Sequence, residues 1–279
     1  MEIGILGPLV LSHADRVAAP TAPKPRSVLG LLLLNGDQIV QSSVLIRDLW
    51  GANPPASAAT TLQTYILQVR KCLSRLVCMS VSEVAEKLLI TANGGYALLT
   101  DSIDFDRRSF DQLATAGRRA LAAGDNAEAA QLLSSACYLW RGAPLADVHA
   151  GVITEPQIRA LEQTRLTTLE QRIDAHMRLG HHQDVLPDLT LLMAEHELNE
   201  NLCAQLMVAL HRSGRRREAL STFQQLRTSM IEELGLEPSK RMHLLQQAIL
   251  SDDPVLEVAP REDGLTQLLD RIVPQRVRA

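Results

Sequence analysis

One segment of the sequence, residues 56–76, combines hydroxyl, amide and cationic side chains and contains no acidic residue. Opposite its apolar residues, at 100° per residue, it places or borders these side chains: Thr60, Thr61, Gln63, Thr64, Tyr65, Leu67, Gln68, Arg70, Lys71 and Arg75. Hydroxyls and cations bind phosphates, and amides bind base edges. A solvated helix face usually carries Glu or Asp as well. The segment is therefore a candidate for binding duplex DNA, with a merely solvated face as the alternative.

The chemistry of these side chains divides them into two sets. A Gln amide donates and accepts at once, which suits the N6 and N7 atoms of adenine, and an aliphatic group suits the thymine methyl. The candidate base contacts are Gln63, Thr64, Leu67 and Gln68. The candidate sugar-phosphate contacts, which would fix the register, are Thr60, Thr61, Tyr65, Arg70 and Lys71.

Two further features stay open on sequence grounds. Trp50 is either an aromatic residue at a helix end or a phosphate contact through its indole N–H. Asn93, Gly94 and Gly95 form either a simple tight turn or a turn that presents backbone N–H groups and Asn93 to the minor groove.

No enzyme signature occurs in the chain: it lacks the phosphate-binding loop, the nucleophile elbow, the zinc-protease helix motif and the dinucleotide-binding glycine pattern. His181 and His182, followed by Asp184, suggest a metal site, but adjacent helical histidines point about 100° apart, so a polar turn is the better explanation. We expect no catalytic residue, no metal site and no cofactor.

Composition favours helices packed on helices, because hydrophobic residues make up 46% of the 279 residues and aromatic residues only 3%. Residues 1–100 carry a net charge of +2 and the remainder −6, which suggests two parts with different partners. The four cysteines show neither zinc-ligand spacing nor a disulfide framework, and no apolar run is long enough to span a membrane. A cytoplasmic, nucleoid-associated protein is expected.

Short elements surround the candidate helix. The Ile/Leu/Val-rich opening over residues 2–11, with a following strand near Val17, predicts a β-hairpin. The prolines at 20–25 predict a stiff connector, residues 27–34 a first helix and residues 42–50 a second.

The candidate helix itself carries an apolar stripe at steps of 4, 3, 4 and 3, formed by Leu62, Ile66, Val69, Leu73 and Leu76. Residues 78–87 are ambiguous, and residues 88–99 predict two strands around the turn at 93–95. Hairpin, three helices, hairpin is the order of a winged helix-turn-helix domain.

From Asp104 onward strand signals disappear, and amphipathic helices are separated by glycines. Gly180 and Gly214 are 34 residues apart, the period of tetratricopeptide repeats, whereas the longer spacing from Gly124 to Gly180 predicts an inserted loop near 141–155. Two or three helix pairs are expected to stack. Residues 254–279 predict a loosely ordered tail with a short helix around 265–272.

Taken together, these residues resemble the Streptomyces antibiotic regulatory protein (SARP) family of actinobacterial transcriptional activators, in its small form. The resemblance covers residues 1 to about 253. Its motifs are Ile5–Leu9, Val28–Leu34, Leu49–Gly51, Thr61–Lys71, Gly94–Tyr96, Asp104–Asp106, Ala136–Asp147, Gln205–Arg215 and Glu232–Pro238. Their joint order and spacing are far more specific than any one of them.

The resemblance implies an α+β, mostly α protein. An OmpR-type winged helix-turn-helix of the two-component effector type, with short β-hairpins, would occupy residues 1–100, and an all-α tetratricopeptide-like bacterial transcriptional activation domain residues 101–253. It also implies side-by-side protomers on direct repeats near promoters of antibiotic biosynthetic gene clusters, and recruitment of RNA polymerase including its sigma factor. By the same resemblance, residues 56–73 are the recognition helix and Trp50 is a phosphate contact.

Two departures from relatives qualify the resemblance. Many relatives have a small polar residue and an Arg where this chain has Leu67 and Gln68, so one groove cation is missing and a shallower salt dependence is expected. The segment 78–87 before the wing is long, so the resemblance does not fix the register of the wing. Two other functions stay open: a tetratricopeptide-like interaction scaffold that does not bind DNA, and a regulator whose helical bundle holds a small ligand.

Overall fold

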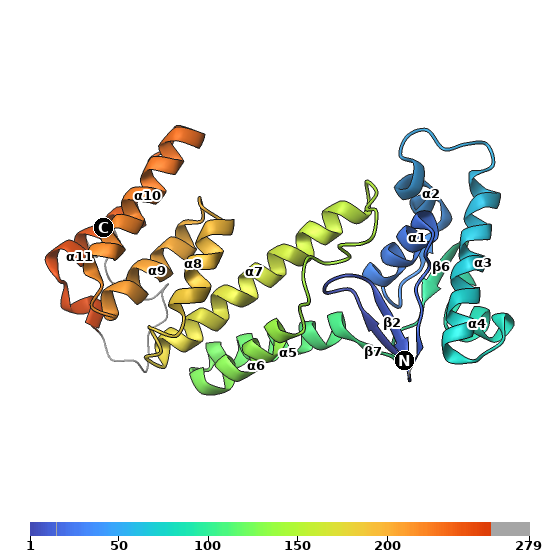
Figure 1. Ribbon diagram of the computed structural model, residues 1–279, viewed down its shortest axis with the longest axis horizontal. Coiled ribbons are helices and arrows are strands. Elements are labelled where there is room, and N and C mark those ends of the chain that lie inside the picture. Colours follow the sequence, from blue (N-terminus) through green and yellow to red (C-terminus); the bar gives the residue numbers. More distant parts are fainter. Residues whose placement is uncertain (15, 258–279) are drawn as a thin grey trace, which may run out of the picture. The chain divides into compact units, whose positions relative to one another are not determined.

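A computed structural model describes residues 1–14 and 16–257 (Figure 1). It is mostly helical, with a few short strands near the N-terminus, which confirms the predicted α+β class. Residues 1–113 and 135–167 form one compact unit, and residues 114–134 and 168 onward form another. Each unit is made of two separate segments of the chain, so the division into units differs from the predicted division into two functional domains near residue 100. The functional division remains a prediction.

The first unit opens with a sheet ordered β3-β2-β1-β7. Its strands are β1 (Glu2–Gly4), β2 (Val10–His13), β3 (Arg16–Val17) and β7 (Asp104–Phe105). Antiparallel pairing of β1 with β2 confirms the predicted hairpin. The sequence does not predict β7, which pairs parallel with β1, because a two-residue strand has no alternating pattern. The prediction that no strand occurs from Asp104 onward is therefore wrong at β7.

Three helices follow: α1 (Pro23–Leu34), α2 (Ser42–Trp50) and α3 (Ala58–Val77). The second and third match their predicted ranges closely. The first begins earlier than predicted, since Pro23 and Pro25 lie in its first turn rather than in a connector. Proline suits this position because a first-turn N–H has no helical partner and the fixed φ is already helical.

Helix α4 (Val81–Lys87) occupies the segment that the sequence left ambiguous. Ser80 caps it: its Oγ accepts from the Glu83 N–H at 3.2 Å, and the Glu83 carboxylate accepts from the Ser80 N–H at 2.9 Å. This reciprocal capping box stabilises the first turn of α4, which is only about two turns long.

The predicted second hairpin is confirmed as β5 (Leu89–Ala92) and β6 (Gly95–Leu98), and a short strand β4 (Val40–Gln41) completes a sheet ordered β4-β6-β5. Asn93 (φ 48°) and Gly94 (φ 76°) form its two-residue turn. Positive φ at both turn residues matches the right-handed twist of the strands, which explains the Asn-Gly pair.

A loop between α6 (Asn126–Tyr138) and α7 (Thr154–Arg178) confirms the predicted insertion. Within the first unit it packs on the turn between β1 and β2: the Leu145 N–H donates to the carbonyls of Ile5 at 3.1 Å and Gly7 at 2.7 Å. Asp147 accepts from the Leu9 N–H at 2.8 Å and forms an ion pair with Arg26. The loop is thus a structural part of the first unit.

Asp48 of α2 caps the start of α7. Its buried carboxylate accepts from the N–H groups of Ile153 and Thr154, both at 2.8 Å, and from the Thr154 hydroxyl at 2.7 Å. A Cβ at Gly151 would lie 2.0 Å from the Asp48 carbonyl oxygen, so the close approach requires glycine. Through Asp48, α2 is fixed to the first turn of α7.

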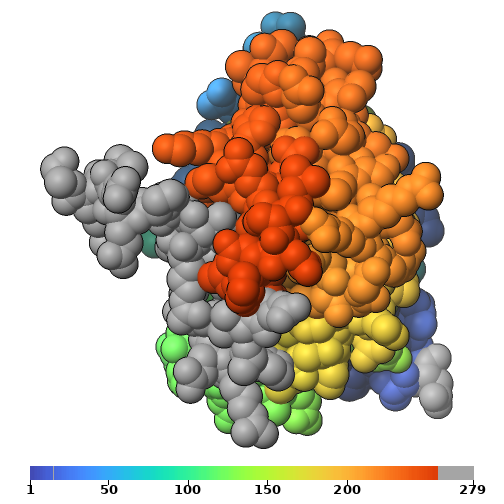
Figure 2. Space-filling view, turned by 90° about the vertical axis from the view of Figure 1, so that its left-hand side faces the viewer, coloured from blue at the N-terminus to red at the C-terminus, as the bar shows by residue number. Residues whose placement is uncertain are grey.

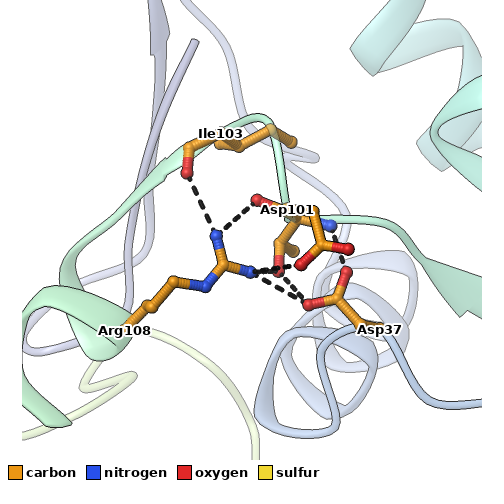
Figure 3. Close-up of polar contacts among 5 residues, drawn as sticks. Asp37, Asp101, Ile103 and Arg108 are labelled. Carbon is orange, nitrogen blue, oxygen red and sulfur yellow. Dashed lines mark hydrogen bonds and ion pairs between the residues drawn. The ribbon is translucent and has the colours of Figure 1, made fainter. Parts of the chain in front are cut away.

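A third polar cluster holds the segment that follows the wing (Figure 3). Asp37 accepts from the Thr100 N–H at 2.6 Å and its hydroxyl at 2.7 Å, and Arg108 donates to Asp37 at 3.0 Å and to the Thr100 carbonyl at 2.8 Å. Arg108 belongs to α5 (Asp106–Ala122). The end of the wing is thereby tied to α5 and to the turn that follows α1.

The second unit continues with α8 (Leu186–Glu195), α9 (Glu200–Arg212), α10 (Arg216–Leu234) and α11 (Lys240–Ser251), each packed on the next. Its buried side chains include Cys203, Met207, Phe223 and Leu245. Gly180 (φ 85°) and Gly214 (φ 76°) follow α7 and α9, as the spacing predicts.

The first residues of the predicted tail are ordered. Pro254–Glu257 form a 3₁₀ turn, η1, in which Leu256 is buried and its carbonyl accepts from Arg212 Nε at 2.9 Å. The prediction of a loosely ordered tail is therefore wrong for residues 254–257, because the buried Leu256 side chain fixes them. The short helix expected around 265–272 lies outside the described residues.

Candidate nucleic-acid interface

The apolar stripe of α3 is buried as predicted. Each of its five side chains is at most 1% exposed: Leu62, Ile66, Val69, Leu73 and Leu76. The helix packs against α1, α2 and α4. Because burying a large aliphatic side chain stabilises by about 1.5–3 kcal/mol, five together fix which face of α3 is left to solvent.

The opposite face is open to solvent, and α3 lies at the outer edge of the first unit (Figure 1). Exposed on it are Thr60, Gln63, Thr64, Leu67, Gln68, Lys71 and Arg75, and partly exposed beside them are Thr61, Tyr65 and Arg70. The structure thus brings the predicted α3 residues to one side. Leu67 is 43% exposed among polar neighbours, so core packing does not explain it.

Thr64 has a reduced set of groups to offer a ligand. Its hydroxyl donates to the Thr60 carbonyl oxygen one turn back, at 3.2 Å. The hydroxyl proton is therefore used within the helix, and the methyl group and the acceptor oxygen remain.

The cations of α3 differ in their availability. Lys71 and Arg75 are exposed, and the described residues provide no hydrogen-bond or ion-pair partner for either side chain. Arg70, by contrast, donates through Nε and Nη2 to the Leu89 carbonyl at 3.0 and 2.8 Å, and through Nη2 to the Thr91 hydroxyl at 2.8 Å. Burial lowers the pKa of this guanidinium, and the nearby Tyr96 opposes the shift. Arg70 therefore links α3 to β5.

Trp50 is held in a stack at the start of the α3 face. Its ring lies 6.2 Å from that of Tyr65 at an interplanar angle of 18°, and Lys24 Nζ lies 4.6 Å from the indole centroid. Lys24 also donates to the Leu49 carbonyl at 3.2 Å. Sequence reasoning missed Lys24 because it placed that residue in a proline connector. No local pattern indicates that the first turn of α1 meets the end of α2.

The turn of the wing is anchored rather than free. The N–H and hydroxyl of Ser42 donate to the Gly94 carbonyl at 3.1 and 2.7 Å. Gly95 is buried, and a Cβ there would lie 2.4 Å from the Val40 carbonyl oxygen. Of the three residues predicted for the wing, Asn93 and Gly94 are exposed and Gly95 is not.

The other candidates from the sequence form no recognisable ligand set. His181 lies beside His176, with the two Nδ1 atoms 3.4 Å apart, and the described residues hold no group of three or more metal-ligating side chains. Burial and the nearby Arg212 lower the pKa of His182 to about 4.

In the part of the chain described, no helix is both long and apolar enough to cross a membrane.

Comparison with known proteins identifies relatives of this chain. Residues 105–250 match the bacterial transcriptional activator domain. Regulatory protein DnrI of Streptomyces peucetius is 45% identical over 257 residues, which cover 92% of this chain and 94% of DnrI. Transcriptional regulator RedD of Streptomyces coelicolor is 33% identical, covering 92% of this chain and 73% of RedD.

Longer relatives also match. Regulatory protein AfsR of Streptomyces griseus is 35% identical over 95% of this chain, which spans only 26% of AfsR. The solved structure of Mycobacterium tuberculosis EmbR, in complex with a low-affinity phosphopeptide, superposes with a TM-score of 0.84 at 28% identity, over 97% of this chain and 68% of EmbR. The whole fold, and not only the matched domain, is shared.

Proposed function

Because the chain belongs to the Streptomyces antibiotic regulatory protein family of transcriptional activators, we propose that it binds duplex DNA through the exposed face of α3 and activates a secondary-metabolite gene cluster. One observation carries the DNA-binding part. A 20-residue helix buries its whole apolar stripe and presents amides, hydroxyls and two unpaired cations without an acidic side chain. A polyanion with base edges in a groove is complementary to such a face.

The proposed contacts follow from exposure. Gln63, Gln68 and the exposed Leu67 face the bases, together with the methyl group of Thr64. The phosphate contacts come from Thr60, Thr61 and Lys71, and from the Trp50 and Tyr65 stack with its cation Lys24. Arg75 extends the same face by one further turn.

Two predicted contacts receive a changed role in this proposal. Arg70 positions the wing, because its guanidinium already donates to β5. At the tip of the wing, Asn93 and Gly94 reach the DNA, since Gly95 is buried.

The remaining parts of the proposal concern assembly. Protomers would lie side by side on direct repeats near a promoter, and the helical part, residues 101–253, would recruit RNA polymerase including its sigma factor. Membership of a family of activators and the bacterial transcriptional activator domain at 105–250 support this division of labour.

The test is a titration of the purified chain against duplex fragments from promoter regions of its neighbouring gene cluster, at several salt concentrations. The triple variant Gln63→Ala, Gln68→Ala, Lys71→Ala is compared with a control carrying Gln131→Ala and Lys240→Ala, which are exposed outside α3. We expect salt-sensitive, sequence-selective binding that the triple variant loses and the control keeps. Equal weak binding to all fragments, unchanged in the triple variant, would contradict the proposal and favour the scaffold function.

A further inference from the structure

The C-terminal end of α10 presents an apolar surface in the second unit. Ile231, Leu234 and Leu236 are 41%, 53% and 57% exposed. Single exposed aliphatic side chains are ordinary, whereas contiguous apolar patches with a polar rim are typical of interaction surfaces. Helices α10 and α11 lie on the face of the molecule shown in Figure 2.

The backbone holds this surface in one conformation. Helix α10 ends at Gly235 (φ 67°), where the N–H groups of Gly235 and Leu236 donate to the carbonyls of Ile231 and Met230 at 3.0 and 3.3 Å. The chain therefore folds back, and Leu236 lies beside the last turn of the helix.

Two further contacts fix the segment that follows. Arg227 of α10 donates twice to the Glu237 carboxylate, at 2.7 and 2.6 Å, and the Ser239 N–H donates to Glu200 of α9 at 2.6 Å. A surface that is already ordered loses little conformational entropy on binding, which favours docking.

Two carboxylates border the apolar side chains. Glu232 and Glu233 are exposed, and neither has an ion-pair partner among the described residues. An acidic border repels nucleic acid. It also disfavours a two-fold dimer through this surface, because the acidic border would face the same acidic border of the second copy. The complementary partner is a protein surface that is both apolar and basic.

We propose that this surface, formed by Ile231, Glu232, Glu233, Leu234 and Leu236 and here named the α10-end surface, docks on a basic, apolar patch of RNA polymerase holoenzyme. The inference rests on the proposed function, since it names the part of the helical domain through which recruitment occurs. Apolar contact supplies affinity, and the carboxylates supply orientation and association rate.

The experiment measures binding of the purified chain to RNA polymerase holoenzyme without DNA, by biolayer interferometry, and binding to a promoter fragment separately. One variant carries Ile231→Ser, Leu234→Ser and Leu236→Ser, and another carries Glu232→Lys and Glu233→Lys. Leu250→Ser on α11 is the matched control, because Leu250 is 53% exposed outside this surface. All these side chains are exposed, so far-ultraviolet circular dichroism melting is expected to stay unchanged.

We expect both surface variants to bind polymerase at least 10-fold more weakly, with DNA affinity unchanged, and Leu250→Ser to behave as the parent chain. Polymerase binding unaffected by the variants overturns the inference and leaves DNA binding intact. A loss of self-association in the variants, seen by light scattering with polymerase binding unchanged, also overturns it and identifies a second copy as the occupant. Failure of the parent chain to bind any DNA fragment counts instead against the proposed function.

Discussion

At the scale of single residues, two neighbouring cations of α3 have different surroundings. Lys71 extends into solvent, whereas Arg70 is half-buried and donates three hydrogen bonds to β5. Only a cation that reaches a phosphate displaces counterions from DNA, so the salt dependence of binding distinguishes the two roles.

We predict that Lys71→Ala reduces the slope of log affinity against log salt concentration by about 0.9, the value for one phosphate contact. Arg70→Ala is expected to weaken binding without changing the slope, because it loosens the wing. Titrations by fluorescence anisotropy over a salt series measure both. An equal reduction of the slope in Arg70→Ala would place this residue on a phosphate after all.

The base contacts give a second residue-scale prediction. Gln68→Ala is expected to relax sequence preference at one base pair and to cost about 1–3 kcal/mol against the preferred base. Binding to a set of operator duplexes substituted one pair at a time measures this change. A uniform loss across all sequences would instead indicate a phosphate contact.

The Asp37 cluster makes the stability of the first unit pH-dependent. Burial raises the pKa of this carboxyl, but donation from Thr100 and Arg108 outweighs burial, so its pKa lies below the ordinary value of 3.8. A depressed pKa contributes stability above pH 3.8, and that contribution is lost as the pH falls through the folded-state value. We predict that Asp37→Asn lowers the free energy of unfolding near neutral pH, and that its difference from the parent chain shrinks below pH 3.8. Urea unfolding at pH 6, 4 and 3 measures it, and a difference that does not vary with pH would exclude the linkage.

At the scale of elements, helices with periodic apolar residues were predictable, and elements made by distant contacts were not. The stripe of α3 and the Asn93-Gly94 turn are local signals, so α3 and the β5–β6 hairpin follow from the sequence. Strands β4 and β7 are two residues long and exist through pairing with β6 and β1. The exposed face of α3 was predictable for the same reason as its buried face, but the engagement of Arg70 and the place of Lys24 depend on tertiary contacts.

The cap that α2 supplies to α7 gives an element-scale prediction. Asp48→Ala leaves the N–H groups of Ile153 and Thr154 without their acceptor, and removal of a partner from buried donors costs about 1–3 kcal/mol. We expect a loss in this range in chemical unfolding. Asp101→Ala is the control, because Asp101 is 91% exposed and lies 3.5 Å from Arg108, so its contribution is within about 0.5 kcal/mol. An equal effect of both substitutions would contradict a specific cap.

At the scale of the whole molecule, the winged helix is completed by residues far along the chain. The loop before α7 forms hydrogen bonds with the turn between β1 and β2 and with α1, and Val148 packs against Gly30 of α1. We predict that a fragment ending at residue 104 unfolds at a lower temperature than the first unit does in the full chain, because Asp48 and Arg26 lose their partners. Thermal unfolding followed by circular dichroism measures this. A fragment as stable as the full chain would show that the loop is dispensable.

Both tryptophans, Trp50 and Trp140, and all three tyrosines, Tyr65, Tyr96 and Tyr138, belong to the first unit. Absorbance at 280 nm and intrinsic fluorescence therefore report on that unit, while the helical circular dichroism signal sums over both. The protein carries a built-in optical label: comparison of the two signals in one unfolding experiment separates the units without dyes, and quenching at Trp50 would report directly on occupancy of the α3 face.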